Sequence, residues 1–188
     1  MKVNRQISFL ILVFFWSFPT ALALTEGDAQ NPRSKDKNEL PTFRYQDQCG
    51  NPVYESSGWS MVMGTVVEVI DGSTMTIRLG DKSERRLHLV AVEAPQTEDK
   101  FWAAARAKLA SLALNRPVLI LVSTSKDKDK ELWGMVQVKG QDINEVMLEE
   151  GLCRYRKPEA YAMSNYTACV YRLVEGEARK AKRGLWQE

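Results

Sequence analysis

Three consecutive β-like segments joined by short turns constrain this chain more than any other feature of its sequence. Residues 61–70 (MVMGTVVEVI) and 74–79 (TMTIRL) flank the turn sequence Asp-Gly-Ser at 71–73, so they predict a β-hairpin. Residues 85–92 (RRLHLVAV) follow a second polar turn and predict a third strand. Strands connected by such short turns pair with one another in antiparallel order.

A helix separates these strands from two more. Residues 97–114 carry alanine and leucine at helical spacing, with Thr97 as the expected cap, and predict this helix. Residues 117–122 (PVLILV) and 132–138 (LWGMVQV) predict the fourth and fifth strands. This order is typical of an OB-type barrel, in which closure removes the exposed sheet edges.

Two helices complete the predicted domain. Residues 142–150 predict a short helix closed by Gly151, and residues 164–183 a longer one closed by Gly184, because glycine favours the position after a helix end. We therefore expect one α+β domain over residues 59–188: a β-barrel with helices.

The first 58 residues are expected to lie outside that domain. Residues 1–23 have Lys2 and Arg5 before an apolar run and end in Ala-Leu-Ala, which predicts a cleaved signal peptide. The run is shorter than the roughly 20 residues that span a membrane, so we expect export to the periplasm or medium without stable membrane insertion. Residues 24–58 are polar, without apolar periodicity, and predict a flexible arm whose aromatic end could pack on the domain.

The charge balance limits how the protein could hold nucleic acid. The chain has 26 Lys and Arg against 24 Asp and Glu, and removal of residues 1–23 takes away two cations and no acid. A neutral mature protein lacks the general basic excess that drives non-specific binding to phosphate. Any role with nucleic acid is therefore expected to come from a local site.

Three cysteines, Cys49, Cys153 and Cys169, would meet an oxidising compartment after export. We favour a disulfide between Cys153 and Cys169, because both lie in the helical C-terminal region, and leave the pairing of Cys49 open. The alternative is that both are buried as small apolar residues. No C-x-x-C pair is present to suggest a zinc site.

Four motifs resemble those of a known family in order and spacing. GTVVEVIDGSTMTIRL, LHLVAVEAPQ, VMLEEGLCRYRKP and EGEARKAKRGLW are similar to the thermonuclease family typified by staphylococcal nuclease, and the resemblance covers residues 62–186. It implies a five-stranded OB-fold of the staphylococcal nuclease type with C-terminal helices. It also implies calcium-dependent hydrolysis of phosphodiester bonds in DNA and RNA, in a family whose members are commonly exported.

The family's metal site is altered in this chain. That site uses two carboxylates, one of them the second acid of an Asp-Gly-Asp-Thr turn, where this chain has Ser73 after Asp71. The second metal carboxylate is lengthened from aspartate to Glu93. Calcium prefers several oxygen ligands, so the resemblance implies at most a weak Ca²⁺ site formed by Asp71, Ser73 and Glu93.

The catalytic positions are altered as well. The resemblance places His88 and Glu131 where the family has its two arginines, and Gln96 where it has the glutamate that activates water. An amide cannot accept the proton. A general base contributes about 10²–10⁴ in rate, and an arginine on a transferring phosphoryl group about 10³–10⁵. None of these three positions is expected to be catalytically competent.

Two hypotheses follow from this pattern. The first is an exported pseudo-nuclease, expected to be a monomer that requires no cofactor and that binds nucleic acid, nucleotide or protein. The alternative is an active secreted, metal-dependent endonuclease that uses altered residues. In that case Arg86, on the same strand face as His88, would be the best substitute cation, assisted by Lys128, Lys130 or a base at Glu98.

Overall fold

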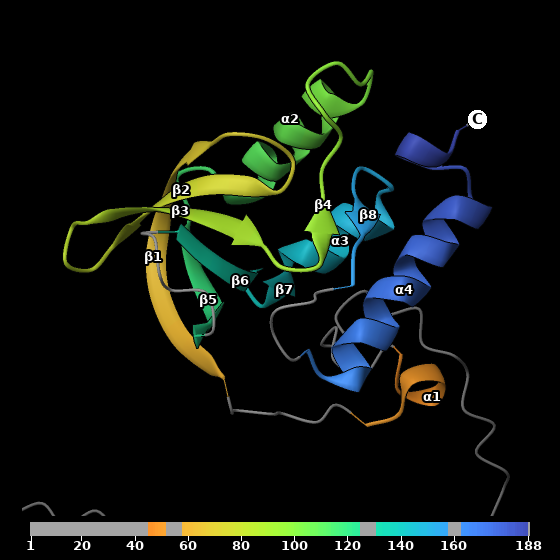
Figure 1. Ribbon diagram of the computed structural model, residues 1–188, viewed down its shortest axis with the longest axis horizontal. Helices are drawn as coiled ribbons and strands as arrows, with labels where there is room; N and C mark the ends of the chain where they lie inside the picture. The colour runs from red at the N-terminus through yellow and green to blue at the C-terminus, as the bar shows by residue number, and fades with distance from the viewer. Residues whose placement is uncertain (1–44, 52–57, 125–130, 158–162, 188) are drawn as a thin grey trace, which may run out of the picture. The chain divides into compact units, whose positions relative to one another are not determined.

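The first two strands form where the sequence predicts them, whereas the third, predicted over residues 85–92, ends at Leu89, because Val90 and Ala91 form a turn in which Ala91 has φ +59°. In this computed structural model β1 is Trp59–Val69, β2 is Thr74–Leu79 and β3 is Glu84–Leu89 (Figure 1). β1 pairs with β2, and β2 with β3, both antiparallel. The structure describes residues 45–51, 58–124, 131–157 and 163–187, so the predicted signal peptide and most of the predicted arm lie outside the described residues.

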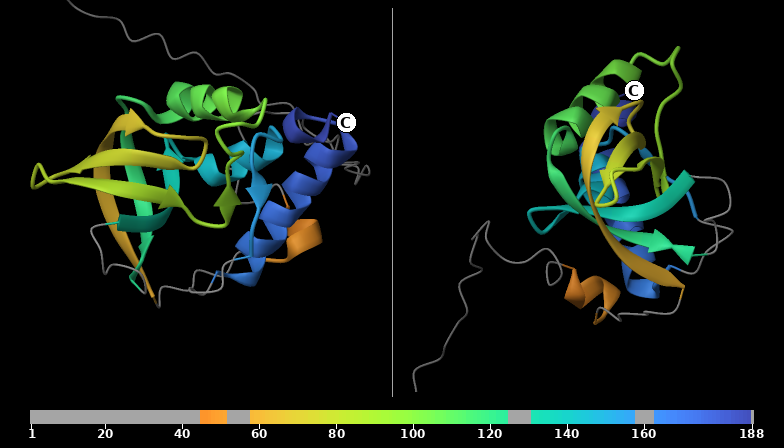
Figure 2. Two further views of the ribbon diagram at one scale, coloured as in Figure 1. Left: turned by 45° about the horizontal axis from the view of Figure 1, so that its top comes forward. Right: turned by 90° about the vertical axis from the view of Figure 1, so that its left-hand side faces the viewer.

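Two later strands close the barrel. β5 (Pro117–Ser123) pairs antiparallel with β1, and β6 (Glu131–Val138) pairs antiparallel with β5. β6 also pairs in parallel with β3, the strand at the other edge of the sheet, so the sheet closes into a barrel. This mixed five-stranded barrel confirms the predicted OB-fold, and Figure 2 shows it from two further sides.

The long strand β1 contributes to two sides of the barrel. Its register with β2 shifts between Val66 and Glu68, which marks a β-bulge. A bulge bends and twists a strand. Residues from Gly64 onward pair with β2, whereas Trp59 to Thr65 pair with β5.

Three helices pack beside the barrel: α2 (Trp102–Ala113), α3 (Ile143–Glu149) and α4 (Asn165–Lys180). The last two begin at side-chain caps, because Asp142 accepts hydrogen bonds from the first turn of α3 and Ser164 from that of α4. The prediction that α2 begins at Thr97 is wrong. Residues 96–99 form a turn in which the Asp99 amide donates to the Gln96 carbonyl, and the helix begins after it.

The core is formed by the inward faces of the barrel strands and by one side of each of these helices. Its largest fully buried side chains are Tyr171, Met75, Ile77, Leu87, Leu89, Leu109, Ile120, Ile143, Met147, Leu148, Val66 and Val90. Asn144 is a buried polar residue among them, and its amide side chain bonds the carbonyls of Val90 and Gly134 and the amide of Val136. It thereby joins α3 to the end of β3 and to β6.

The predicted disulfide is wrong. Cys49 pairs with Cys169, and Cys153 is a free, buried thiol whose sulfur lies 3.4 Å from the carbonyl oxygen of Gly72. Cys49 ends the short helix α1 (Gln46–Cys49), which Tyr45 anchors in the core at 3% exposure. The end of the predicted arm therefore packs on the domain beside α4, which brings Cys49 within bonding distance of Cys169.

The remaining elements are short. β4 (Val92–Glu93) pairs with β8 (Arg154–Tyr155), and β7 (Gln141–Asp142) extends the sheet from β6. The 3₁₀ turn η3 (Gly184–Trp186) ends the described chain. In the part of the chain that the structure describes, no helix has the length and apolar character needed to cross a membrane.

The two predicted closing glycines have different roles. Gly151 has φ +66° just beyond the end of α3, as predicted. Gly184 does not close α4, because that helix ends at Lys180 and Lys182 adopts the left-handed conformation after it. Instead Gly184 lies directly against the Gly151 carbonyl, where a Cβ atom would have no room.

Candidate functional site

The fold brings together the two turns that the sequence singles out. The first, at residues 71–73, leads into β2; the second, Glu93 to Gln96, begins at the last residue of β4. Gly72 packs so closely on the second turn that a Cβ atom on it would lie 3.3 Å from the Cβ atom of Ala94. The Ser73 carbonyl also accepts a hydrogen bond from the Leu89 amide at 2.8 Å, which ties the first turn to the end of β3.

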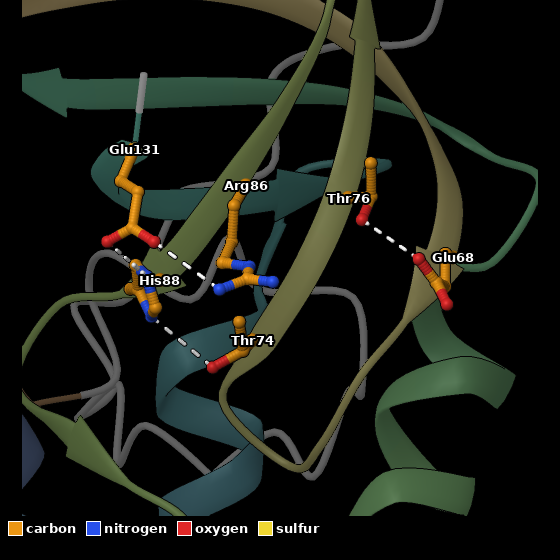
Figure 3. Close-up of polar contacts among 6 residues, drawn as sticks. All are labelled: Glu68, Thr74, Thr76, Arg86, His88 and Glu131. Carbon is orange, nitrogen blue, oxygen red and sulfur yellow. Dashed lines mark hydrogen bonds and ion pairs between the residues drawn. The ribbon is translucent and has the colours of Figure 1, made fainter. Parts of the chain in front are cut away.

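His88 and Glu131, the residues at the two family arginine positions, contact each other. The parallel register of β3 and β6 places Arg86 beside Glu131 and His88 beside Trp133. The Glu131 carboxylate lies 3.3 Å from Nε2 of His88 and 3.4 Å from a guanidinium nitrogen of Arg86 (Figure 3). The side chain predicted as the best substitute cation is therefore already paired with an acid.

His88 is held on three sides. Its Nδ1 lies 3.3 Å from the Thr74 hydroxyl, on the neighbouring position of β2, and its Nε2 faces Glu131 (Figure 3). Its ring stacks on Trp133, with 4.4 Å between ring centroids and 21° between ring planes. Both ring nitrogens thus have a protein partner, and 21% of the side chain remains exposed.

The electrostatic character of this surface differs from that of a phosphate site. A site that stabilises charge on phosphorus presents fixed cations at the reacting group. Here the Glu131 carboxylate offsets the charge of Arg86 and would repel a phosphate. The pair is half exposed, so water screens it.

Glu93 also has a cationic partner. β4 and β8 place it opposite Arg154, and its carboxylate lies 3.2 Å from a guanidinium nitrogen of Arg156. The Arg156 amide donates to the Ala91 carbonyl at 3.0 Å, which fixes the backbone of this cation beside the turn. Our sequence reasoning missed Arg156, and its place in the motif VMLEEGLCRYRKP was the available signal.

The candidate calcium ligands are engaged within the protein. The Asp71 carboxylate accepts hydrogen bonds from the amide of Ser73 at 2.7 Å and from its hydroxyl at 3.1 Å, while Glu93 pairs with Arg156. The described residues contain no group of three or more His, Cys, Asp or Glu arranged to hold a metal. The weak site of Asp71, Ser73 and Glu93 remains a prediction.

Gln96 lies in an open depression of about 550 Å³ beside the second turn. Glu98, the candidate substitute base, lines the same depression. The backbone N–H of Gln96 donates a hydrogen bond to the Asp99 carboxylate at 2.8 Å. The full lining is Glu93, Ala94, Pro95, Gln96, Glu98, Asp99, Lys100, Phe101, Arg154 and Leu185. Lys128 and Lys130 lie outside the described residues.

Comparison with known proteins agrees with this geometry. The family model described as "Staphylococcal nuclease homologue" matches residues 86–188, more than half of the chain. The chain belongs to the staphylococcal nuclease family. This membership confirms the resemblance of the four motifs and agrees with the barrel and its C-terminal helices.

Several bacterial relatives are similar to this family member over most of their length. Protein ParB of Escherichia coli is 30% identical over 148 residues, which cover 72% of this chain and 78% of ParB. Micrococcal nuclease of Shigella flexneri is 29% identical, over 69% of this chain and 76% of the nuclease. An uncharacterized endonuclease of Escherichia coli O157:H7 is 26% identical, over 68% and 78% respectively.

Proposed function

We propose that this member of the staphylococcal nuclease family is an exported binding protein that no longer hydrolyses nucleic acid. The observation that carries the proposal is the Glu131 carboxylate, which lies within 3.4 Å of both Arg86 and His88 where the family has arginines. Gln96 adds to it, because an amide replaces the proton acceptor. The altered groups act as a unit, so their separate effects do not simply multiply.

Nucleic acid is the ligand class that the charge distribution favours. Residues 151–188 carry eight cations and four acids. Residues 58–150 carry twelve cations and fourteen acids. The mature chain has no net charge, but its C-terminal segment is basic. Such a segment could supply the local site that binding to phosphate requires.

Digestion of single- and double-stranded DNA and RNA by the purified mature protein tests the loss of hydrolysis. The assay includes calcium, magnesium, manganese or a chelator in parallel. We expect no metal-dependent cleavage above the level of a buffer control. Metal-dependent cleavage that disappears in Glu93→Ala would establish the alternative, an active endonuclease. That alternative is favoured by one feature, the open depression that Glu93 and Glu98 share.

Titration of a labelled single-stranded oligonucleotide at two salt concentrations tests the ligand class. We expect binding that weakens with salt, because each phosphate contact on a single strand contributes a slope of about 0.7 in log K against log salt. Arg172→Ala/Lys180→Ala, in the basic segment, should weaken binding and reduce that slope. Lys82→Ala/Arg116→Ala removes the same charge from the barrel and is the matched control. Absence of binding at low salt would exclude nucleic acid and leave a nucleotide or protein ligand.

A further inference from the structure

One half of β1 has an unpaired edge. β1 pairs with β5 from Trp59 onward, but its pairing with β2 begins only at Gly64, opposite Leu79 at the end of β2. Among the residues that the structure describes, no strand pairs with the second edge of residues 60–63. Figure 1 shows this half of β1 running on past β2 with β5 on its other side.

The same half of β1 carries the most exposed large apolar side chains of the described structure. Met61 is 67% exposed and Met63 is 70% exposed. They lie on one face, because strand residues two apart point the same way. The cross-strand partners Leu121 and Leu119 on β5 lie on that face too, so the open edge adjoins a continuous apolar surface. Contiguous exposed apolar surface commonly marks an interaction site.

In the part of the chain that the structure describes, this edge lacks the features with which proteins prevent strand pairing. Natural edge strands carry charged side chains or proline, are very short, or are covered by another element. Residues 59–65 (WSMVMGT) contain no charge and no proline. The register also leaves four consecutive positions, Ser60 to Met63, beyond the end of β2. Among residues 45–51, 58–124, 131–157 and 163–187, nothing pairs with this edge, which is uncharged and long enough for another strand to add to it.

We propose that residues 61–63 of β1 pair antiparallel with the same residues of a second copy of this chain, forming a symmetric dimer in which Val62 lies opposite Val62 and Met61 lies opposite the Met63 of the other copy. An antiparallel pair of identical strands is related by a twofold axis, the commonest symmetry of oligomers. The segment is uncharged, so two copies do not repel each other along it. The pairing brings the four methionines of the two copies together and satisfies backbone groups that face solvent in the monomer.

A second copy fits this edge better than nucleic acid does. An apolar, uncharged strand offers nothing to phosphate, and the basic C-terminal segment is a different part of the chain. The dimer replaces the monomer expected from the sequence. It does not depend on the proposed loss of hydrolysis, since the altered catalytic residues lie on other elements.

Sedimentation velocity of the mature protein, over a concentration range up to about 100 µM, tests the dimer. We expect a reversible monomer–dimer equilibrium. Met61→Lys/Met63→Lys should raise the dimer Kd by about tenfold or more, because it places like charges opposite each other across the pair. Ser111→Lys/Leu114→Lys adds the same charge at exposed positions of α2 and just beyond its end and should leave the Kd unchanged.

Hydrogen exchange identifies the edge itself. Amides in the peptide that contains residues 60–63 should become more protected as the concentration of wild-type protein rises, and not in Met61→Lys/Met63→Lys. Circular dichroism melting of both variants shows whether they remain folded. The proposal is wrong if the wild type stays monomeric at the highest concentration. It is equally wrong if Met61→Lys/Met63→Lys leaves the dimer Kd unchanged, or if the hydrogen-exchange protection of these amides does not change with protein concentration.

Discussion

Glu131 illustrates how a single residue changes the chemistry of an inherited site. The sequence places an acid at a position where the family has an arginine. The structure adds that this acid contacts both His88 and Arg86, so the cation that could have compensated is neutralised as well. Glu93 is matched by Arg156 in the same manner. The site has thereby become a set of internal ion pairs.

Restoring the family residues should give hydrolysis if these replacements cause the loss that we propose. We expect Ser73→Asp/His88→Arg/Gln96→Glu/Glu131→Arg to cleave DNA in calcium at least about 10²-fold faster than the wild type, because a base alone contributes that much. A fluorescent oligonucleotide assay measures the rate. The matched control keeps Gln96 and changes the other three positions; it should be at least about 10²-fold slower than the four-position variant. Equal rates in the two variants would contradict the assignment of Gln96.

The Cys153 thiol should be unreactive toward disulfide reagents in the folded protein. Burial raises the pKa of its thiol far above the usual range, with a smaller contribution from the nearby Asp71 carboxylate. Only the thiolate reacts with disulfide reagents. At pH 8 we expect no reaction of the native protein with a chromogenic disulfide, and one thiol per chain after unfolding without reductant. Rapid reaction of the native protein would show that Cys153 is accessible.

At the scale of elements, α1 and α4 depend on each other through a covalent link. Cys49 and Cys169 are 120 residues apart in sequence, and Tyr45 inserts into the core next to this link. A disulfide that closes so long a loop restricts the unfolded chain strongly. The short helix α1, which has only four residues, could not persist by its own hydrogen bonds.

Removing this disulfide should destabilise the whole domain. We expect Cys49→Ala/Cys169→Ala to lower the free energy of unfolding by about 2–5 kcal/mol, measured by urea denaturation without reductant. Addition of reductant to the wild type should reproduce most of that loss, and should change the stability of the double variant little. If reductant affects both proteins equally, Cys49 and Cys169 are not paired with each other.

At the scale of the whole molecule, export would account for the disulfide. Disulfides such as that between Cys49 and Cys169 form and persist mainly in oxidising compartments. We expect the full-length chain, expressed in a Gram-negative host, to appear in the periplasm or medium with an N-terminus near Leu24. Intact mass spectrometry of each fraction measures this, with a chain that begins at Leu24 as the cytoplasmic control. An uncleaved full-length chain in the cytoplasm would contradict the proposed signal peptide.

The sequence predicted most of the architecture because strands and helices are encoded locally. Apolar alternation and turn residues placed β1, β2, β5 and β6 to within a few residues. The start of α2 was missed because a turn closed by Asp99 uses the residues that resemble a helix cap and first turn. Gly184 was misread for a similar reason: its contact is with the Gly151 backbone and not with the helix before it.

The sequence by itself determined the order of elements, the family and the identity of the residues at each altered catalytic position. Only the tertiary structure decided which of those residues meet. His88 and Glu131 are 43 residues apart, and Glu93 and Arg156 are 63. Periodicity and turn chemistry act over a few neighbouring residues, whereas these pairs form because barrel closure and the pairing of β4 with β8 bring distant segments together. The cysteine partners and the open edge of β1 were hidden from the sequence for the same reason.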